Sequence, residues 1–452
     1  MKRTFIFIMM VLVVSMMAAC SKNNRTVIDT SVNSSEDEKD LSRQRKDQSQ
    51  FQTKPVMEAV SQEKVREAIE KTDNLLINED YQFFVPEKCD SVFTFDRYYN
   101  WTEDGSKYLG DFVSAVKEVF PDEKYDEKKL MFVGERFFNT LNNTESQNEL
   151  PAYSDYKNEV DSGSENVKYF IYQDTSADNP VFVESTGYLG SNLFRFNRAK
   201  LLSLKNSLTG EEMPSFLEVY LPNMYSDYVE SFRPDSEESF KLMDSEMKIC
   251  DAVKFFEDYL NNLSFLASED VKTKVVRVDL YKFTYDPKEY ENRLSDEKYE
   301  TYFYLMNYSF EYKGLLFSYA EIADGAMFTK SYGQPVNAIG AMVRTDEVEF
   351  VYELQHCIWA KDVEEYDKIV SVEDAIKECS EKLTPNVRYS VLDIGLFYQQ
   401  DEMSFVDKEK PETGYHYVYP IWRFTLFNQN DERYYRVFFD ALTGEFLAIQ
   451  GM

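Results

Sequence analysis

The sequence predicts an α+β fold in which helices pack on antiparallel sheets. Aromatic residues make up 16% of the 452-residue chain, with 33 Tyr and 35 Phe, and these side chains suit half-buried strands. Glycine and proline are scarce, at 15 and 13 residues. Apolar residues recur at helical spacing, and strand-like runs follow them. A chain of this length is large enough for two or three domains and a substantial core.

The N-terminus has the features of a secretory signal. Lys2 and Arg3 give a charged start, an apolar run covers residues 5–17, and two alanines precede Cys20. This order is typical of a cleavable signal peptide. The alternative is an uncleaved membrane anchor, but about 13 apolar residues are short of the roughly 20 that span a bilayer. Because no later apolar run is long enough, we expect no other membrane span.

The segment Met-Ala-Ala-Cys that ends at Cys20 resembles the lipobox of bacterial lipoproteins. The resemblance implies that residues 1–20 are a lipoprotein signal peptide. It also implies that Cys20 is acylated, with palmitate or a similar chain, and becomes the new N-terminus. We therefore expect the protein on the extracytoplasmic face of the cell membrane. Taken whole, the chain resembles uncharacterised lipoproteins of low-GC Gram-positive bacteria.

Charge restricts the classes of partner. The chain has 81 acidic and 50 basic residues, which gives a formal net charge of −31. This charge argues against nucleic acid and against a basic membrane-binding patch. The expected partners are the membrane, through the lipid anchor, and an envelope protein or peptide. A purely solubilising role for the charge stays open.

Residues 21–55 are predicted to be a disordered tether, because polar and charged residues dominate and apolar periodicity is absent. An N-terminal α+β domain is expected over residues 56–235. Apolar spacing predicts helices there over residues 60–76 and 112–120, and short aromatic runs predict strands.

The C-terminal half repeats the order of a helix followed by strands, which predicts a duplicated helix-plus-sheet unit. The first unit is assigned to residues 236–345 and the second to residues 346–452. A helical stripe opens each unit, and Ser371 with Asp374 forms a capping box at the start of the second. The predicted helices cover residues 252–266 and 372–383, and the predicted strands cover residues 275–285, 302–310, 315–319, 387–398, 417–427 and 434–439.

The last 80 or so residues resemble a PepSY-type domain, a small helix-and-sheet module of secreted and lipid-anchored bacterial proteins. The motifs are the helix around Ala375 and Ile376, the alternating residues Pro420, Trp422 and Phe424, and the closing residues Asp440, Ala441, Thr443, Gly444 and Glu445. We expect Trp422 and Phe424 to share one buried face. Asp440 should accept amide hydrogen bonds, and Gly444 should adopt a positive φ. The resemblance implies that some such proteins restrain peptidases or modulate membrane sensor kinases.

Four cysteines remain after Cys20, namely Cys89, Cys250, Cys357 and Cys379. An even number outside the cytoplasm permits two disulfides with three connectivities, and the spacing selects none. Cys379 falls on the apolar stripe of a predicted helix, so a buried free thiol is the favoured alternative there.

No catalytic signature is evident. The two histidines, His356 and His416, have the surroundings of packing residues, and a zinc site is not expected. Ser-x-x-Lys occurs at residues 114–117, 245–248 and 295–298, but the companion motifs of such acyl-transfer enzymes are missing. We therefore expect no enzyme activity, no cofactor and no metal. An acidic turn over residues 428–432 could offer oxygen ligands to calcium, but its spacing favours a plain hairpin turn.

These observations predict a lipid-anchored extracytoplasmic protein that acts as a binding or regulatory module. One alternative is a solute-binding or cell-wall-ligand-binding lipoprotein. Another is an extracytoplasmic hydrolase with paired carboxylates, which no sequence pattern selects.

Overall fold

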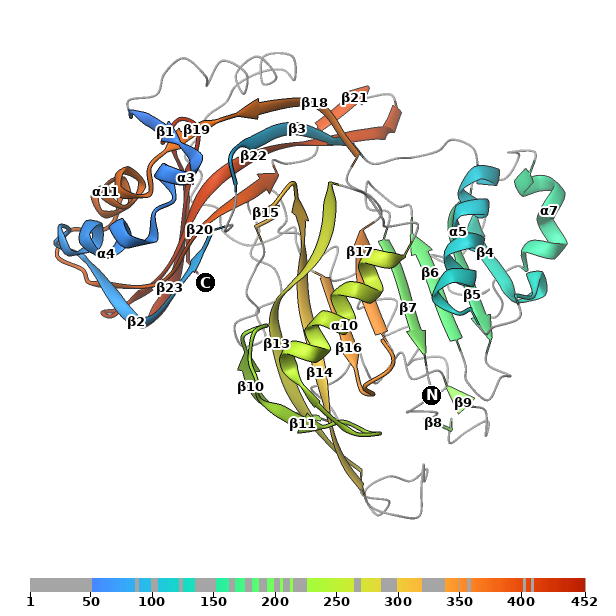
Figure 1. Cartoon of the computed structure of the whole chain (residues 1–452). Helices are drawn as coiled ribbons and strands as arrows, with labels where there is room; N and C mark the ends of the chain where they lie inside the picture. Colours follow the sequence, from blue (N-terminus) through green and yellow to red (C-terminus); the bar gives the residue numbers. More distant parts are fainter. Residues whose placement is uncertain are drawn as a thin grey trace.

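The computed structural model contains two large β-sheets, of ten and eight strands, that lie next to one another (Figure 1). Three small two-stranded sheets accompany them. The described residues are 51–85, 89–98, 105–121, 125–134, 152–161, 167–174, 181–186, 193–198, 204–205, 212–213, 226–263, 270–285, 299–318, 338–348, 350–355, 359–400, 404–407 and 410–451.

The ten-stranded sheet runs from β10 at one edge to β4 at the other, and neighbouring strands are antiparallel (Figure 1). Helices α10, α5 and α7 pack against β13, β5 and β4. In order across the sheet, the strands are β10 (Ser226–Phe232), β13 (Val271–Tyr285), β14 (Tyr299–Tyr312), β16 (Ala338–Met342), β17 (Phe350–Gln355), β7 (Leu193–Arg198), β6 (Val181–Thr186), β5 (Val167–Asp174) and β4 (Leu130–Gly134), and β15 (Leu315–Leu316) pairs with β14. The helices are α5 (Gly105–Val119), α7 (Tyr153–Asp161) and α10 (Ile249–Asn262).

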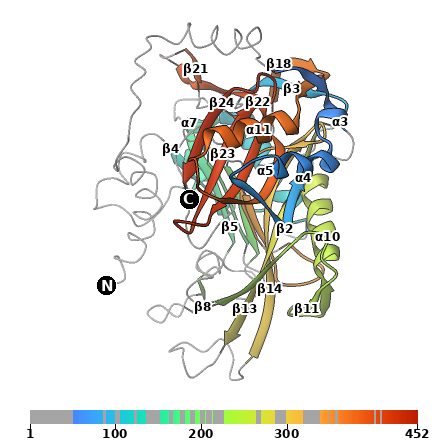
Figure 2. The same ribbon diagram turned by 90° about the vertical axis from the view of Figure 1, so that its left-hand side faces the viewer.

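The eight-stranded sheet is built mainly from the C-terminal part of the chain, and helices α4 and α11 pack together beside it (Figure 2). Its central strand, β22, pairs with β20 on one side and with β3 and β23 on the other. The strands are β18 (Trp359–Tyr366), β3 (Val92–Tyr98), β22 (Lys410–Asn428), β20 (Tyr389–Gln400), β2 (Leu75–Phe84), β21 (Ser404–Asp407), β23 (Arg433–Asp440) and β24 (Phe446–Gly451). The helices are α4 (Gln62–Glu70) and α11 (Val372–Lys382).

The smaller elements are η3 (Glu127–Lys129), α3 (Val56–Ala59) and three strand pairs. The pairs are β1 (Thr53–Pro55) with β19 (Lys368–Val370), β8 (Leu204–Lys205) with β9 (Glu212–Met213), and β11 (Ser239–Lys241) with β12 (Glu246–Lys248).

The predicted fold class, α+β with helices packed on antiparallel sheets, is wrong. The described residues are mostly strand, and the helices are few and flank large sheets. The aromatic and β-branched runs extend the sheets well beyond the area that these helices cover, because such side chains suit strands on both faces. The predicted duplication fails for a related reason. The strands after α10 belong to the ten-stranded sheet, whereas those after α11 belong to the eight-stranded sheet.

The sheets combine strands from segments that the sequence analysis placed in different domains. β2 and β3, from residues 56–235, lie in the eight-stranded sheet with β20 and β22. β2 is parallel to β20, which the expectation of antiparallel sheets did not include. Long-range pairing of this kind leaves no local pattern in a sequence. The predicted domain boundaries at residues 56, 236 and 346 stay a prediction.

Predictions for single helices and turns agree better with the structure than the predicted fold class does. The stripe on α10 is buried at helical spacing, through Ile249, Ala252, Val253, Phe256 and Leu260. The Lys313-Gly314 turn separates β14 from β15, and both residues have positive φ. The helix predicted over residues 60–76 is shorter than expected, because α4 ends at Glu70 and Leu76 lies in β2.

An aromatic cluster joins the two large sheets. The rings of Phe95 and Tyr312 lie 4.5 Å apart, and those of Phe317 and Tyr398 lie 5.6 Å apart. The backbone N–H of Ser318 also donates to the carbonyl of Tyr398 at 2.7 Å. All four rings are buried, so the sheets share one core at this point.

Candidate functional site

The turn between β23 and β24 has the geometry that its sequence predicts. Oδ1 of Asp440 accepts hydrogen bonds from the backbone N–H of Leu442 at 2.7 Å and of Thr443 at 3.0 Å. Gly444 has a φ of 76°. Both expectations are confirmed. The carboxylate fixes the turn, and glycine supplies a left-handed conformation that other residues adopt only at a cost.

The first described residues of the chain pack on this turn. The ring of Phe51 fills the space beside Gly444, where an added Cβ would collide with Cδ2 of Phe51. Two residues later, β1 pairs with β19, and Thr53 lies opposite Val370. Residues 51–55, the last residues of the segment predicted to be a disordered tether, are therefore ordered and fixed to the C-terminal part of the chain. No local sequence pattern indicates this contact, because the residues lie far apart in the chain.

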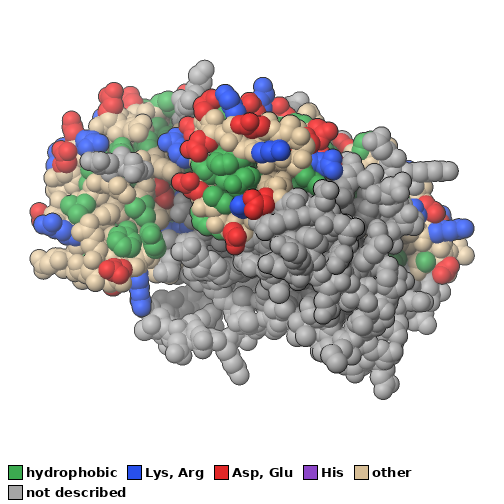
Figure 3. Space-filling view, turned by 90° about the horizontal axis from the view of Figure 1, so that it is seen from below, with side chains coloured by type: hydrophobic (Ala, Val, Ile, Leu, Met, Phe, Trp, Pro, Cys, Tyr) green, Lys and Arg blue, Asp and Glu red, His purple; other side chains and the backbone are tan. Residues whose placement is uncertain are grey.

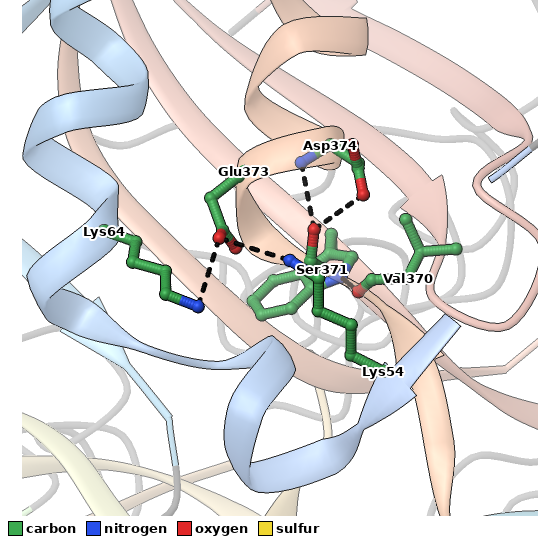
Figure 4. Close-up of polar contacts among 7 residues, drawn as sticks. Lys54, Lys64, Val370, Ser371, Glu373 and Asp374 are labelled. Atoms are coloured by element: carbon green, nitrogen blue, oxygen red, sulfur yellow. Dashed lines mark hydrogen bonds and ion pairs between the residues drawn. The ribbon is translucent and has the colours of Figure 1, made fainter. Parts of the chain in front are cut away.

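Polar contacts at the start of α11 hold the same segment (Figure 4). Oγ of Ser371 accepts a hydrogen bond from the Asp374 N–H at 3.3 Å, which confirms the predicted cap. The Glu373 carboxylate lies 3.4 Å from the ammonium groups of both Lys54 and Lys64. One acidic residue on α11 therefore contacts basic residues on β1 and α4.

The carboxyl group of Glu373 titrates below its ordinary range. Burial alone would raise its pKa, but a hydrogen bond from its own backbone N–H and the charges of Lys54 and Lys64 together hold the pKa below the usual 4.5. Because both lysines are substantially exposed, each ion pair contributes at most about 1 kcal/mol. We call Phe51, Lys54, Lys64, Glu373 and Gly444 the tether junction.

Trp422 lies beneath the tether junction. The ring is fully buried, and its Nε1 donates a hydrogen bond to the carbonyl of Val370 at 2.9 Å. Phe424 is equally buried and meets Phe439 edge to face. The prediction that Trp422 and Phe424 share one buried face is confirmed. Val370 is in turn tied to the closing turn, because its N–H donates to the Ala441 carbonyl at 2.8 Å.

A second feature lies on the ten-stranded sheet, where three aromatic rings cross three neighbouring strands. Tyr228, Tyr281 and Phe303 are cross-strand partners on β10, β13 and β14. Tyr228 meets Tyr281 edge to face at 5.8 Å, and Tyr281 stacks on Phe303 at 5.3 Å. We call these three residues the aromatic ladder. The view from below shows hydrophobic side chains among acidic and basic ones on the described surface (Figure 3).

Buried charged groups occur in both large sheets. In the eight-stranded sheet, the Arg423 guanidinium lies 3.3 Å from the Asp393 carboxylate and 4.2 Å from the ring centroid of Phe397. In the ten-stranded sheet, Asp279 pairs with Arg277 at 3.0 Å and accepts a hydrogen bond from Asn307 at 2.8 Å. These carboxylates are neutralised by neighbouring donors, which is what buried charge requires.

The predicted lipidation residue, Cys20, lies outside the described residues, as does Cys357. Cys89, Cys250 and Cys379 are free, which excludes the two-disulfide arrangements. Burial raises the pKa of the Cys89 thiol to about 11 and also raises the pKa of Cys379, which confirms the buried thiol on the α11 stripe. Both thiols are therefore poor nucleophiles.

The Ser-x-x-Lys segments do not bring serine and lysine into catalytic contact. Oγ of Ser114 donates to the Gly110 carbonyl at 2.8 Å, while Lys117 lies over the ring of Tyr125. In the second segment, Oγ of Ser245 lies 3.3 Å from the Thr345 hydroxyl, and Lys248 pairs with a glutamate instead. The third segment, residues 295–298, is outside the described residues.

His356 is also outside the described residues, and His416 lies on β22 opposite Arg97 in register.

The acidic turn is a hairpin between β22 and β23, as expected, since Asn428 lies opposite Arg433 and the Asn430 N–H donates to Asn428 Oδ1 at 2.9 Å. Within the described ranges, no cluster of His, Cys, Asp or Glu has the arrangement of a metal site. No helix in those ranges is long and apolar enough to cross a membrane.

Comparison with known proteins gives two structural similarities. No family model matches the chain, and no curated protein matches it. An uncharacterized protein from Eubacterium rectale ATCC 33656 is similar over 86% of this chain and 99% of its own, with 12% identity and a TM-score of 0.42. The Bacillus megaterium YpeB C-terminal domain is similar over 71% of this chain and 99% of its own, with 14% identity and a TM-score of 0.22. Both TM-scores lie below 0.5, so neither structure assigns a function to this chain.

Proposed function

We propose that the protein is a lipoprotein of the bacterial cell envelope, anchored to the extracytoplasmic face of the cell membrane by an acyl chain on Cys20. One observation carries this proposal. A charged start, a short apolar run and two alanines lead directly to that cysteine, and this order is what export and signal cleavage require. The tether junction supports it, because the body is fixed to the end of the segment that would reach from the membrane.

Metabolic labelling with radioactive palmitate tests the anchor. The wild-type chain should take up label and fractionate with membranes, whereas Cys20→Ala should be unlabelled and unprocessed. Cys250→Ala is the matched control, since Cys250 is free and only partly buried and its loss should leave labelling unchanged. Equal labelling of the wild-type and Cys20→Ala chains would refute the proposed site.

The folded body acts as a binding or regulatory module for an envelope protein or peptide, without enzymatic activity. The serines of the two described Ser-x-x-Lys segments bond elsewhere, and the two buried thiols have raised pKa values. Exposed apolar side chains support a binding role, since Tyr228 is 56% exposed and large aromatic side chains are typical of interfaces.

The C-terminal residues support the further proposal of a PepSY-like module that presents this body on its tether. The closing turn at Asp440 and Gly444 and the capped helix α11 have the geometry that the resemblance implies. Cross-linking in intact membranes tests the binding role. The same protein or peptide should be recovered repeatedly with the wild-type chain and lost with Cys20→Ala, and repeated recovery of no partner would contradict the role.

A further inference from the structure

β10 is the outer strand of the ten-stranded sheet (Figure 1). Among the described strands it pairs only with β13, so one side of its backbone has no described strand beside it. The side chains of residues 227–231 are all exposed. An outer strand of this kind offers its N–H and C=O groups to an added strand. We call residues 226–232 the β10 edge.

The β10 edge carries little of the usual protection against pairing. Proteins commonly shield an outer strand with lysine or proline, and the segment Ser-Asp-Tyr-Val-Glu-Ser-Phe contains neither. Tyr228 and Val229 instead expose 56% and 45% of their surface. A bulge between Tyr228 and Glu230 and two acidic residues are the only protective features of the segment.

The register places apolar and acidic side chains of the β10 edge on opposite faces. Tyr228 lies opposite Tyr281, so it belongs to the face of the aromatic ladder. Asp227 lies opposite Lys282, one residue along β13, and therefore belongs to the other face. Glu230 lies opposite Leu280, which is on that same face. The bulge after Tyr228 is what brings both acidic residues to one side.

The charge on this second face is negative. Lys282 is the basic residue nearest to Asp227 in register, but it pairs with Glu300 at 3.0 Å. Two copies of the β10 edge would place acidic side chains against one another, and like charges on neighbouring strands are destabilising. An added strand with basic side chains on this face would instead be attracted.

We propose that the β10 edge binds an extended peptide segment in which basic and apolar side chains alternate. The segment adds one strand beside β10. Its apolar side chains continue the aromatic ladder next to Tyr228, and its lysines or arginines face Asp227 and Glu230. This inference names the partner class for the binding role proposed above and rests on that role, but not on the lipid anchor.

Fluorescence anisotropy with the full-length chain in detergent tests the proposal. The probe is a fluorescein-labelled peptide of alternating lysine and valine, and the control peptide has glutamate at each lysine position. The alternating basic peptide should bind and the acidic one should not. Asp227→Lys/Glu230→Lys should weaken binding by about tenfold or more, since two attractive contacts become repulsive.

A matched variant separates the β10 edge from the net charge of the chain. Glu67→Lys/Glu70→Lys makes the same charge change on exposed positions of α4, near the other sheet. It should leave peptide binding within about twofold of wild type, because exposed charges farther away than a Debye length are screened. An equal loss in both double variants, or no binding by the wild-type chain, would overturn the proposal.

Hydrogen exchange locates the peptide. Added peptide should slow exchange of backbone amides in residues 226–232, and protection confined to another edge such as β24 would overturn the proposal.

Sedimentation tests whether a second copy of the chain, rather than a peptide, occupies the β10 edge. A dimer that the β10 double variant abolishes would show that a second copy fills the edge, which would also overturn it. Peptide binding should be the same in Cys20→Ala, so failure of the anchor and failure of this inference are distinguishable.

Discussion

The tether junction and the β10 edge both present a strand for pairing, but among the described residues a partner strand is present at the junction and not on the outer side of β10. At the junction, β1 pairs with β19, and Phe51 covers Gly444. At the β10 edge, residues 227–231 are exposed, and no described strand lies on the outer side. Residues 51–55 are thus held by internal packing, whereas the β10 edge is the surface on which we propose that a peptide pairs.

Replacing a large ring in each region gives the largest expected contrast. Trp422→Ala removes a fully buried indole beneath the junction, so the free energy of unfolding should fall by about 3–5 kcal/mol. Tyr228→Ala removes a mostly exposed ring and should cost no more than about 1 kcal/mol. Urea unfolding followed by circular dichroism measures both. Similar losses would show that the β10 edge is as closely packed as the junction.

The contact between Phe51 and Gly444 gives the next largest effect. Gly444→Ala places a methyl group against the ring at a φ of 76°, which should cost about 2–3 kcal/mol. In a Phe51→Ala background the cost should fall to about 1–2 kcal/mol, the penalty of the left-handed conformation alone.

Gly110→Ala is the control for this substitution. Gly110 lies inside α5, and an added Cβ there meets nothing within 4 Å. The change should therefore stabilise the protein by about 0.5–1 kcal/mol. A stabilising Gly444→Ala would contradict the packing described at the junction.

The closing turn itself has a smaller expected effect. Asp440→Ala removes the acceptor of two backbone amides, and the loss should be about 1–2 kcal/mol. Asp440→Asn keeps an acceptor oxygen, so most of the stability should return. Thermal unfolding of the three chains measures this order, and a loss in Asp440→Asn equal to that in Asp440→Ala would show that charge rather than hydrogen bonding holds the turn.

The ion pairs of Glu373 give the smallest effect, and it depends on pH. A carboxyl group with a lowered pKa binds fewer protons in the folded state, so its contribution is present above the unfolded pKa and is lost as the pH falls through the folded pKa. Glu373→Gln should therefore cost less than about 1 kcal/mol near neutral pH. The difference from wild type should shrink below the ordinary pKa of 4.5. A difference that grows in acid would mean that the pKa is raised.

Predictions from the sequence succeeded where the determining contacts are local. Ser371 and Asp374 are three residues apart, and Asp440 bonds to amides two and three residues away. The fold class failed because strands far outnumber helices in the described residues and form two large sheets, whose strand partners are distant in the chain. β2 pairs with β20, although most of the chain separates the two strands in the sequence. No local propensity or spacing predicts such a partner.

The two surfaces compared above were missed for different reasons. The contact of Phe51 with Gly444 is long-range, and an isolated phenylalanine at the end of a polar segment gives no sign of it. The β10 edge has a strand-like composition, but the bulge at Val229 interrupts its alternation. Its position as an outer strand follows only from the complete sheet.

The sharpest test is backbone hydrogen exchange of the full-length chain, with and without the alternating lysine and valine peptide. It shows whether the outer side of β10 is unpaired while β1 at the junction is paired with β19. Without peptide, amides of β1 and β19 should exchange slowly, and those of β10 that point away from β13 should exchange quickly. Added peptide should slow the β10 amides and leave the junction unchanged. Slow exchange throughout β10 before any peptide is added would contradict an unpaired outer side of β10.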